Sequence, residues 1–473
     1  MLRHRLRILR PTVPVAAQSG IAFEEKEGQM GIDGFSRRDF LINTGMASAA
    51  AMLPAEMRAQ GSPSQSVQAP PEAWSTEWAS AVLSLDERDR RWAKVRKLMS
   101  RDGVDVIVCF PCTSSHDRGA ADSRYLTQLG ENADETNVAF PIEGEVTAWL
   151  SRGGVWPTSN WLTHILPTPR GTGGATISKW LRENPQFQSS RIAIAALDST
   201  PLTRVRAIEG EAPWRSVEIL KQGFPKAQFI SASPILGEAR YQKSEEEISF
   251  LRKGTHVAEL TAETLHQYAR EGTRERHVFA QMMFTSADAG GTFTPMFGWV
   301  SGPLGHTYHR IEQPTFRTLK RGDVVECEIE GRWGGYVAQV DRTVMVGPAP
   351  QELEDGMKLV FESFNRMAEK MKPGATMREI LEAGQIKGLN GRAQVEPIVH
   401  GRGLGDDGPL LVGGRPDENL LNIQVVNNCT FIIKPGLKLA GVADYCRWGD
   451  TVVVGSQGGQ RLGHSPQELL VRS

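Results

Sequence analysis

The sequence predicts an α+β protein built from two domains. The chain has 473 residues, of which 40% are hydrophobic, and this is ample for two large cores. Residues 239–473 alternate long helical patterns with β-rich segments, which is typical of helices packed on a curved antiparallel sheet. Residues 73–238 alternate single helices with single strands, which favours a smaller α/β layer.

The elements of the smaller domain follow from its hydrophobic pattern. A charged segment with helical periodicity predicts a helix over residues 86–101. The apolar runs 104–110 and 192–196 each predict a buried strand.

The larger domain contains longer helices and longer strands. Thr376 precedes a helical pattern that begins at Met377, so its hydroxyl is expected to cap that helix. The predicted helices cover 245–271 and 350–371, and the predicted strands cover 324–330 and 337–346.

The first 60 residues carry the features of an export signal. Residues 35–41 read Phe-Ser-Arg-Arg-Asp-Phe-Leu, a twin-arginine signature, and they are followed by a weakly apolar stretch from Ile42 to Leu53 and by small residues near Ala59 that suit cleavage. This stretch is too short and too alanine-rich for a stable membrane span. We therefore expect recognition by the twin-arginine machinery, cleavage near Ala59 and release into the periplasm. The alternative is a cytosolic protein with a chance pair of arginines.

Two further features belong to this region. Met30 lies six residues before Ser36 and is an alternative start of the protein, because the residues before it resemble neither a signal nor a domain. Residues 61–72 are dominated by serine, glutamine and proline, so they are expected to form a linker.

The charge balance favours a small-molecule substrate. The chain has 54 basic and 55 acidic residues and a formal net charge of −1, so no global field attracts nucleic acid or an anionic membrane. A small neutral or zwitterionic partner is expected instead.

The five cysteines are predicted to have structural roles. Cys109 and Cys112 have the spacing of a redox pair and are expected to form a local disulfide or to be two buried thiols. Cys327, Cys429 and Cys446 are expected to fill core.

Short motifs follow one another in a fixed order through the second half of the chain. Together they resemble the pita-bread superfamily of aminopeptidase P, prolidase, methionine aminopeptidase and creatinase. The segments that carry the resemblance are 239–248, Ser301-Gly302 with His309, 321–325 with Glu328, Gly335-Tyr336 with Arg342-Thr343, His400 with Gly403-Leu404, Lys434-Pro435-Gly436, and Arg447 with 450–454.

The resemblance implies a C-terminal pita-bread catalytic domain and a smaller creatinase-type N-terminal domain. It places residues 123–126 at the edge of a strand. It also implies a homodimer, because in these enzymes the smaller domain commonly covers the pocket of a neighbouring subunit.

The resemblance further implies five positions that hold a pair of divalent ions, and four of them carry a different residue here. Two cations need several ionised oxygen or imidazole donors to offset their dehydration and mutual repulsion, so we expect no metal cofactor. The five positions are Glu328, Gln339, His400, Lys434 and Gly449.

A divalent metal remains the alternative cofactor. A shifted register would use Asp341 and Glu330 as ligands, but it breaks the match of Gly335-Tyr336 and Arg342-Thr343.

Lys434 puts a fixed positive charge where the resemblance implies a bridging carboxylate. Facing Glu328, its ammonium would keep the pocket near neutrality and would polarise a carbonyl or bind a carboxylate of the substrate. The alternative is that Lys434 only fills space and pairs with Glu328.

His309 aligns with the histidine that serves as acid and base in creatinase, which works without metal. A neutral imidazole can take a proton from water and return it to a leaving nitrogen. The alternative is a hydrogen-bonded histidine without a catalytic role. His306 would replace His309 if the loop register differs, and His400 is expected to assist.

Two further residues are candidates for substrate binding. Asp407 stands where the resemblance implies a second histidine, beside Asp406, and the two acids would favour a cationic group if they point inward. If they point outward they form an ordinary solvated turn. Arg342 is expected to brace the site at the end of its strand.

Three functions remain open at this point. The first is an exported, metal-independent, creatinase-like hydrolase or lyase that acts on a small molecule at an amide, amidine or similar bond. The second is a periplasmic metallopeptidase of Xaa-Pro type. The third is a non-catalytic ligand-binding protein that kept the pocket.

Overall fold

The computed structural model describes most of the chain after the predicted signal region and linker. All described residues belong to one compact unit. The described residues are 82–111, 120–129, 136–151, 161–203, 205–206, 208–291, 297–305, 314–412 and 418–472.

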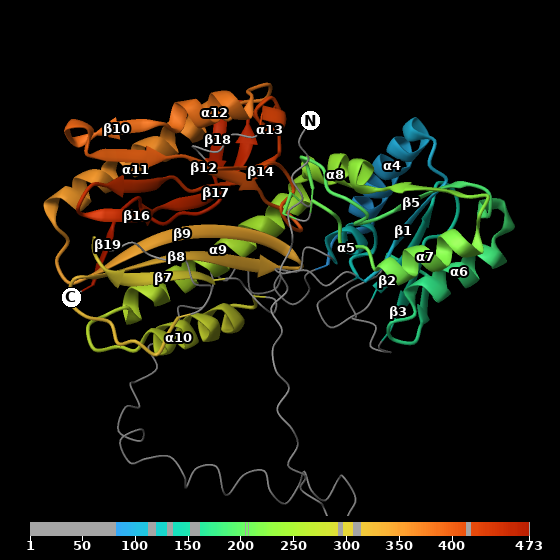
Figure 1. Ribbon diagram of the computed structural model, residues 1–473, viewed down its shortest axis with the longest axis horizontal. Helices are drawn as coiled ribbons and strands as arrows, with labels where there is room; N and C mark the ends of the chain where they lie inside the picture. Colours follow the sequence, from blue (N-terminus) through green and yellow to red (C-terminus); the bar gives the residue numbers. More distant parts are fainter. Residues whose placement is uncertain are drawn as a thin grey trace, which may run out of the picture. The chain divides into compact units, whose positions relative to one another are not determined.

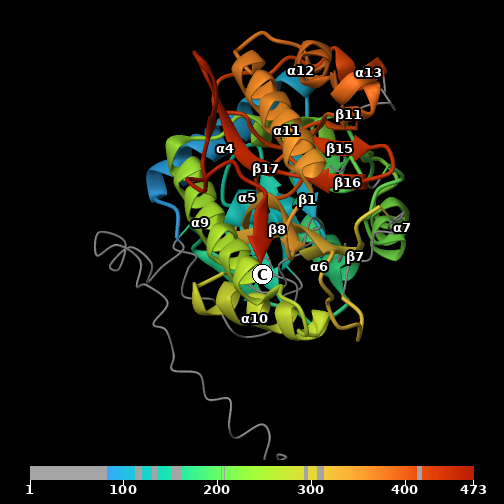
Figure 2. The same cartoon turned by 90° about the vertical axis from the view of Figure 1, so that its left-hand side faces the viewer.

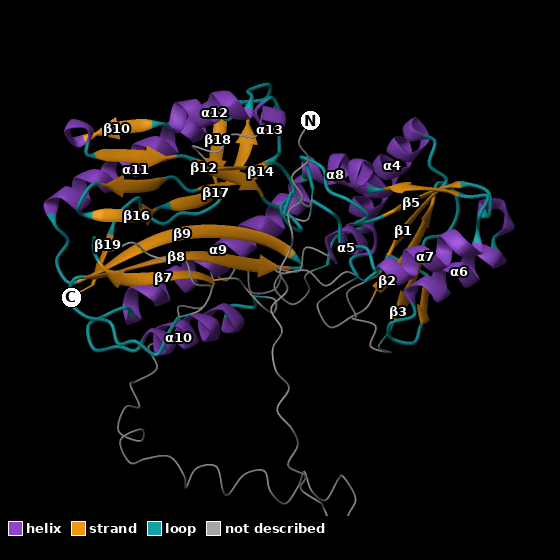
Figure 3. Cartoon of the chain, viewed as in Figure 1, coloured by secondary structure: helices purple, strands orange, loops and turns teal. Residues whose placement is uncertain are grey.

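A six-stranded sheet forms the first domain, with helices on both of its faces (Figure 3). Its strand order is β4-β3-β2-β1-β5-β6. Its elements are α4 (Leu85–Asp102), β1 (Val106–Cys109), α5 (Ala121–Thr127), β2 (Thr136–Pro141), β3 (Thr147–Leu150), β4 (His164–Pro167), α6 (Gly173–Glu183), a 3₁₀ turn (Pro185–Phe187), β5 (Arg191–Ile194), α7 (Trp214–Gly223), β6 (Gln228–Ser231) and α8 (Ser233–Tyr241).

The two faces of this sheet are set by strand alternation along β1. Val106 and Val108 belong to the core beneath α6 and α7. Ile107 and Cys109 belong to the core on the opposite face, with α4, α5 and α8. Successive side chains of a strand point to opposite faces, so an apolar run without alternation is what a strand covered on both sides requires.

A nine-stranded sheet dominates the second domain (Figure 1). Its main path is β13-β12-β14-β17-β9-β8-β7, with β18 paired to β17 and β19 to β9. Its strands are β7 (Phe297–Pro303), β8 (Asp323–Trp333), β9 (Tyr336–Val346), β12 (Ile398–Gly401), β13 (Leu410–Val412), β14 (Thr430–Ile433), β17 (Gly449–Gly455), β18 (Gly458–Arg461) and β19 (Leu470–Arg472).

A smaller sheet and several helices complete this domain. The four-stranded sheet has the order β10-β11-β15-β16. The remaining elements are α9 (Glu245–Tyr268), α10 (Glu275–Asp288), α11 (Gln351–Lys370), α12 (Met377–Gly384), β10 (Ile386–Gly388), a 3₁₀ turn (Leu389–Gly391), β11 (Ala393–Glu396), α13 (Glu418–Leu421), β15 (Gly436–Leu439) and β16 (Ala443–Arg447).

The helices cover the sheets through apolar layers. One core lies between α9, α10 and strands β7 to β9, and another lies beneath α11 and α12. Figure 2 shows α9 beside β8 and α11 beside β15. No helix among the described residues has the length and apolar character needed to cross a membrane.

The predicted fold class is confirmed, and the predicted helices and strands are present within a few residues of their expected ends. Thr376 caps α12 through a capping box with Glu379. Two predictions need correction. The first helix of the second domain ends at Tyr268 rather than 271, because Gly272 and Thr273 turn to pair with Leu319. Residues 123–126 lie in helix α5 rather than at a strand edge.

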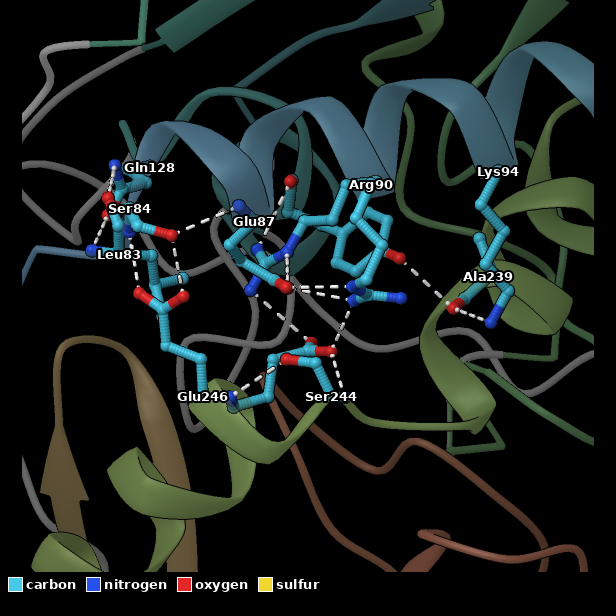
Figure 4. Close-up of polar contacts among 12 residues, drawn as sticks. Leu83, Ser84, Glu87, Arg90, Lys94, Gln128, Ala239, Ser244 and Glu246 are labelled. Atoms are coloured by element: carbon cyan, nitrogen blue, oxygen red, sulfur yellow. Dashed lines mark hydrogen bonds and ion pairs between the residues drawn. The ribbon is translucent and has the colours of Figure 1, made fainter.

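Helix α4 is joined to the start of α9 by charged contacts (Figure 4). Arg91 is fully buried and pairs with Glu87 at 2.6 Å and with Glu247 at 3.3 Å. Its guanidinium also donates to the Tyr336 hydroxyl at 2.6 Å and lies 4.6 Å from the ring centre of Tyr125. A buried arginine is stable only with such partners, so this cluster fixes α4 against the β8–β9 turn and α9.

Replacing Arg91 tests this contact. Arg91→Ala leaves Glu87 and Glu247 buried with fewer cations, so we expect a loss of about 3–5 kcal/mol in the free energy of unfolding. The matched control is Arg378→Ala, which breaks an exposed pair with Glu418 and should cost less than about 1 kcal/mol. Urea unfolding followed by circular dichroism measures both. Equal losses in the two variants would contradict the assigned role of Arg91.

Candidate functional site

One face of the nine-stranded sheet brings the predicted site residues together in rows. Glu328 on β8 pairs with Asp341 on β9, and Asp341 pairs with Gly449 on β17. Lys434 follows Ile433 at the end of β14, and Ile433 pairs with the residue after Gly449. Directly opposed residues share a face, so these side chains form one line across the sheet.

A second row lies beside the first and carries the predicted histidine. Glu330 pairs with Gln339, and the backbone N–H of Gln339 donates to the Thr451 hydroxyl at 2.8 Å. Thr451 pairs with Ile432, and Ile432 pairs with His400 on β12. The row therefore runs from β8 to β12 on the same face as Glu328.

A third row supplies an arginine. Glu326 pairs with Thr343, and Thr343 exchanges hydrogen bonds with the backbone of Arg447 at 2.8 and 3.0 Å. Arg447 is the last residue of β16, which leads into β17, and its side chain reaches the first row.

The carboxylates of these rows are paired with two buried cations. The ammonium of Lys434 lies 2.8 Å from Oε1 of Glu328. The guanidinium of Arg447 contacts Glu328, lies 2.9 Å from Glu326 and is 3.5 Å from Asp341. All five side chains are at most 4% exposed, so water screens these interactions little.

Because Gly449 has no side chain, the side chain of Lys434 can extend across β17 to Glu328. A Cβ atom at position 449 would lie 2.5 Å from Cβ of Lys434 and 2.6 Å from the carbonyl oxygen of Ile433. Real side chains do not approach this closely, so any larger residue at 449 would force the β14 end to move. The absence of a side chain here lets Lys434 extend over β17 and β9 toward β8.

The three acids do not all need to be charged. Burial raises the pKa of Glu326 well above its ordinary value, and nearby Asp341 and Glu328 raise it further, against the opposing effect of Arg447. The surroundings therefore favour the neutral form of Glu326.

His400 lies at the other end of the second row and is neutral. Burial, together with the charges of Arg402 and Lys434, lowers the pKa of His400 to about 3, although Asp406 opposes the shift. Its Nδ1 lies 3.3 Å from the Gly401 carbonyl oxygen and 3.4 Å from Oδ1 of Asp406. Its Nε2 is buried and has no hydrogen-bond partner among the described residues.

Asp406 and Asp407, in the loop that follows β12, point toward cations of the protein itself. Asp407 is buried, contacts Arg240 and lies 3.7 Å from the Lys243 ammonium. Asp406 is also buried and accepts a hydrogen bond from Arg206 at 2.8 Å. Both inward orientations agree with one of the two expected arrangements, but the cations that they meet belong to the chain itself.

Arg342 lies on the opposite face of the sheet. It is adjacent to Asp341 on β9, and neighbouring residues of a strand point to opposite sides. Its guanidinium donates to the Asp341 and Gly449 carbonyl oxygens and stacks 4.7 Å from the ring centre of Trp448. Arg342 therefore braces the backbone between β9 and β17, as the sequence predicts, and does not share the face that carries Glu328.

Two predicted residues cannot be placed. His309 and His306 lie outside the described residues. Cys112 also lies outside them, whereas Cys109, Cys327, Cys429 and Cys446 are buried.

The donor set does not fit a pair of divalent ions. Of the five implied ligand positions, Glu328 and His400 alone carry ionisable oxygen or imidazole donors, and Lys434 brings a positive charge to Glu328. Glu328 also belongs to a group of three carboxylates, with Glu326 and Asp341, whose ligand atoms lie within 4.8 Å of one another and which could hold a single cation. The same three acids surround Arg447, so a guanidinium already supplies positive charge there.

The sequence analysis missed Glu326 and Arg402, and it gave Arg447 no role at the site. The pattern Glu326-Cys327-Glu328-Ile329-Glu330 places three acids at a spacing of two residues, which on a strand means one face. Arg402 lies 3.2 Å from Glu330 and 3.6 Å from Asp406, and its position two residues after His400 gives it the same face.

Comparisons with known proteins agree with this geometry. Residues 249–456 match the model of metallopeptidase family M24. The chain is 27% identical over 277 residues to the Xaa-Pro dipeptidase of Pyrococcus furiosus, covering 57% of this chain and 76% of that protein.

Solved structures of the same group share the fold. The X-Pro aminopeptidase of Thermotoga maritima superposes with a TM-score of 0.61 at 18% identity, over 80% of this chain and 99% of that one. The prolidase of Thermococcus sibiricus gives a TM-score of 0.62 at 20% identity, over 81% and 99% of the two chains. With its motifs in order and its sheets arranged in this way, the chain has the pita-bread fold, and its residues 249–456 resemble metallopeptidase family M24.

Proposed function

We propose that the chain is an exported, metal-independent, creatinase-like hydrolase or lyase that acts on a small molecule at an amide, amidine or similar bond. One observation carries the proposal: the Lys434 ammonium lies 2.8 Å from Glu328, across the place where Gly449 has no side chain. Two protein cations, Lys434 and Arg447, then supply the positive charge that metal ions would otherwise supply to these carboxylates.

Each residue has a defined role in this proposal. His309 moves protons between the attacking group and the leaving nitrogen. Lys434 and Glu328 orient the substrate, with the ammonium facing a carbonyl oxygen or carboxylate, and His400 assists. The twin-arginine signature supports export to the periplasm, and the resemblance supports a homodimer.

A metal-dependent Xaa-Pro peptidase is the second candidate. It is favoured by the dipeptidase names of the relatives and by the carboxylate group of Glu326, Glu328 and Asp341. A third candidate is a ligand-binding protein without turnover. The three candidates differ in metal content and in product formation, so two measurements separate them.

Metal content is the first measurement. We expect mature protein purified without chelator to contain far less than one divalent ion per chain by elemental analysis, because Lys434 and Arg447 repel a cation placed among these acids. Added Mn²⁺, Zn²⁺ or Co²⁺ should not raise the melting temperature, since a ligand that binds only the folded state must raise it. Near two ions per chain would favour the Xaa-Pro peptidase instead.

Activity is the second measurement. Small amides, amidines and ureas are screened beside Xaa-Pro dipeptides, with release of amine or ammonia as the readout. On the active compound, His309→Ala should lower the rate by about 10²–10⁴-fold, which is the usual contribution of general acid–base catalysis. Arg378→Ala is the matched surface control. Full activity of His309→Ala would refute the proposed shuttle, and tight binding without product would favour the ligand-binding protein.

The path of Lys434 over Gly449 is tested by a pair of glycine variants on one strand. Gly449→Ala should lower the free energy of unfolding by about 1–3 kcal/mol, because the new methyl group overpacks against Lys434 and the Ile433 carbonyl. Gly455→Ala, also on β17, meets no heavy atom closer than 3.4 Å and should change stability much less. Equal effects in urea unfolding would contradict the close packing at 449.

A further inference from the structure

A second cavity lies on the face of the nine-stranded sheet that is opposite to the candidate site. Its volume is about 470 Å³, which is within the range of small-molecule sites. Its walls are one face of α9, the segment 464–468 that leads into β19, and Arg342 of β9. Neither Glu328 nor Lys434 lines it, so this cavity is separate from the site described above.

Arg342 provides a hydrogen-bond donor at the inner wall of the cavity. Its Nη1 donates to the carbonyl oxygens of Asp341 and Gly449. Its Nη2 is buried and has no hydrogen-bond partner among the described residues, because the nearby Asp450 pairs with Arg461 at 2.7 Å instead. A buried donor without an acceptor costs free energy, so folded proteins rarely keep one unless a ligand or water completes it. The missing partner of Nη2 is an acceptor oxygen.

Carboxylates line the remainder of the cavity. Glu259 and Glu263 are four residues apart on α9 and therefore share a face, and Glu468 adds a third acid. Oε1 of Glu259 accepts hydrogen bonds from the backbone N–H groups of His464 and Ser465, at 2.7 and 2.6 Å, and from the Ser465 hydroxyl. These bonds fix its carboxylate at the wall.

Glu263 has no cation beside it in the part of the chain that the structure describes. Burial and the negative charge of Glu259 raise the pKa of Glu263, and no positive group opposes them. An ammonium group between the two carboxylates would relieve this repulsion. The cavity therefore needs an acceptor at Arg342 and a positive charge at the glutamates.

We infer that this cavity binds a small zwitterion, with its carboxylate facing Arg342 and its ammonium facing Glu259 and Glu263. Leu260 and Leu470 line the same cavity and can contact the carbon chain between the two charges. A simple anion would meet the glutamates, and a simple cation would leave Nη2 without an acceptor. The inference goes beyond the proposed function and does not depend on it.

A ligand at this place would also contact the candidate site indirectly. The guanidinium that receives its carboxylate through Nη2 holds the backbone of Asp341 and Gly449 through Nη1. Arg342 thus connects the two faces of the sheet.

Binding is tested by isothermal titration calorimetry on the full chain. The probes are glycine, 4-aminobutyrate and 6-aminohexanoate, whose charges lie at increasing separation. Butyrate, butylamine, hexanoate and hexylamine are the matched controls, because each carries only one of the two charges. We expect at least one zwitterion to bind about tenfold more tightly than both of its single-charge analogues, since each loses one charge-assisted contact.

Two variants assign the binding to this cavity. Glu263→Gln removes one charge at an exposed side chain and should weaken zwitterion binding about tenfold. Glu183→Gln is its matched control, because Glu183 is an exposed glutamate of α6 that faces Lys179, and it should leave the affinity unchanged. Arg342→Lys keeps the positive charge without the second terminal nitrogen, so it should weaken binding of the zwitterion and not that of the amine. Glu263→Gln keeps the test decisive if Arg342→Lys fails to fold.

Three results would overturn the inference. The first is that none of the zwitterions binds. The second is that the amines bind as tightly as the zwitterions, which would leave Arg342 without a role. The third is zwitterion binding that Glu263→Gln and Glu183→Gln affect equally, which would place the probe elsewhere on the protein. None of these results depends on metal content or turnover, so the proposed function stands or fails separately.

Discussion

The contact between Lys434 and Glu328 is the constraint on which the rest of the site depends. It joins β14 to β8 across two intervening strands, and it requires that Gly449 carry no side chain. Once this ammonium is fixed, the neighbouring acids need only one more cation, and Arg447 supplies it. The acids of the cluster are therefore paired with cations of the protein itself, and burial raises the pKa of Glu326.

The same sheet serves two purposes because its faces alternate. Glu326, Glu328 and Glu330 of β8 and Asp341 of β9 line one face, while Val340, Val344 and other apolar residues pack beneath α9 and α10 on the other. Arg342 falls on the apolar side, where backbone carbonyls and the Trp448 ring surround it. Burying so many charges is costly unless each is paired, so the ion pairs here hold an arrangement in place more than they add stability.

Much of the fold and part of the site could be predicted from the sequence. Helix starts are local signals, as at Ser244 and Thr376, and the order of the motifs placed Glu328, His400 and Lys434 in one domain. Arg342 follows Asp341 directly on one strand, and neighbouring strand residues point to opposite faces. The sequence alone therefore predicts that Arg342 does not share the face that carries Asp341.

The ion-pair partners of Asp406 and Asp407 could not be predicted from local sequence patterns. Arg206 and Arg240 lie 200 and 167 residues away from them, and only the packing of the first domain against the second brings these side chains together. The raised pKa of Glu326 likewise depends on burial and on neighbours contributed by two other strands.

The glycine at 449 has a consequence for how this site can change over generations. A glutamate introduced there alone would collide with Lys434, and a glutamate introduced at 434 alone would face Glu328 with one buried cation fewer. Either single substitution is therefore expected to destabilise the folded protein. A carboxylate-rich centre at these two positions would require both substitutions together.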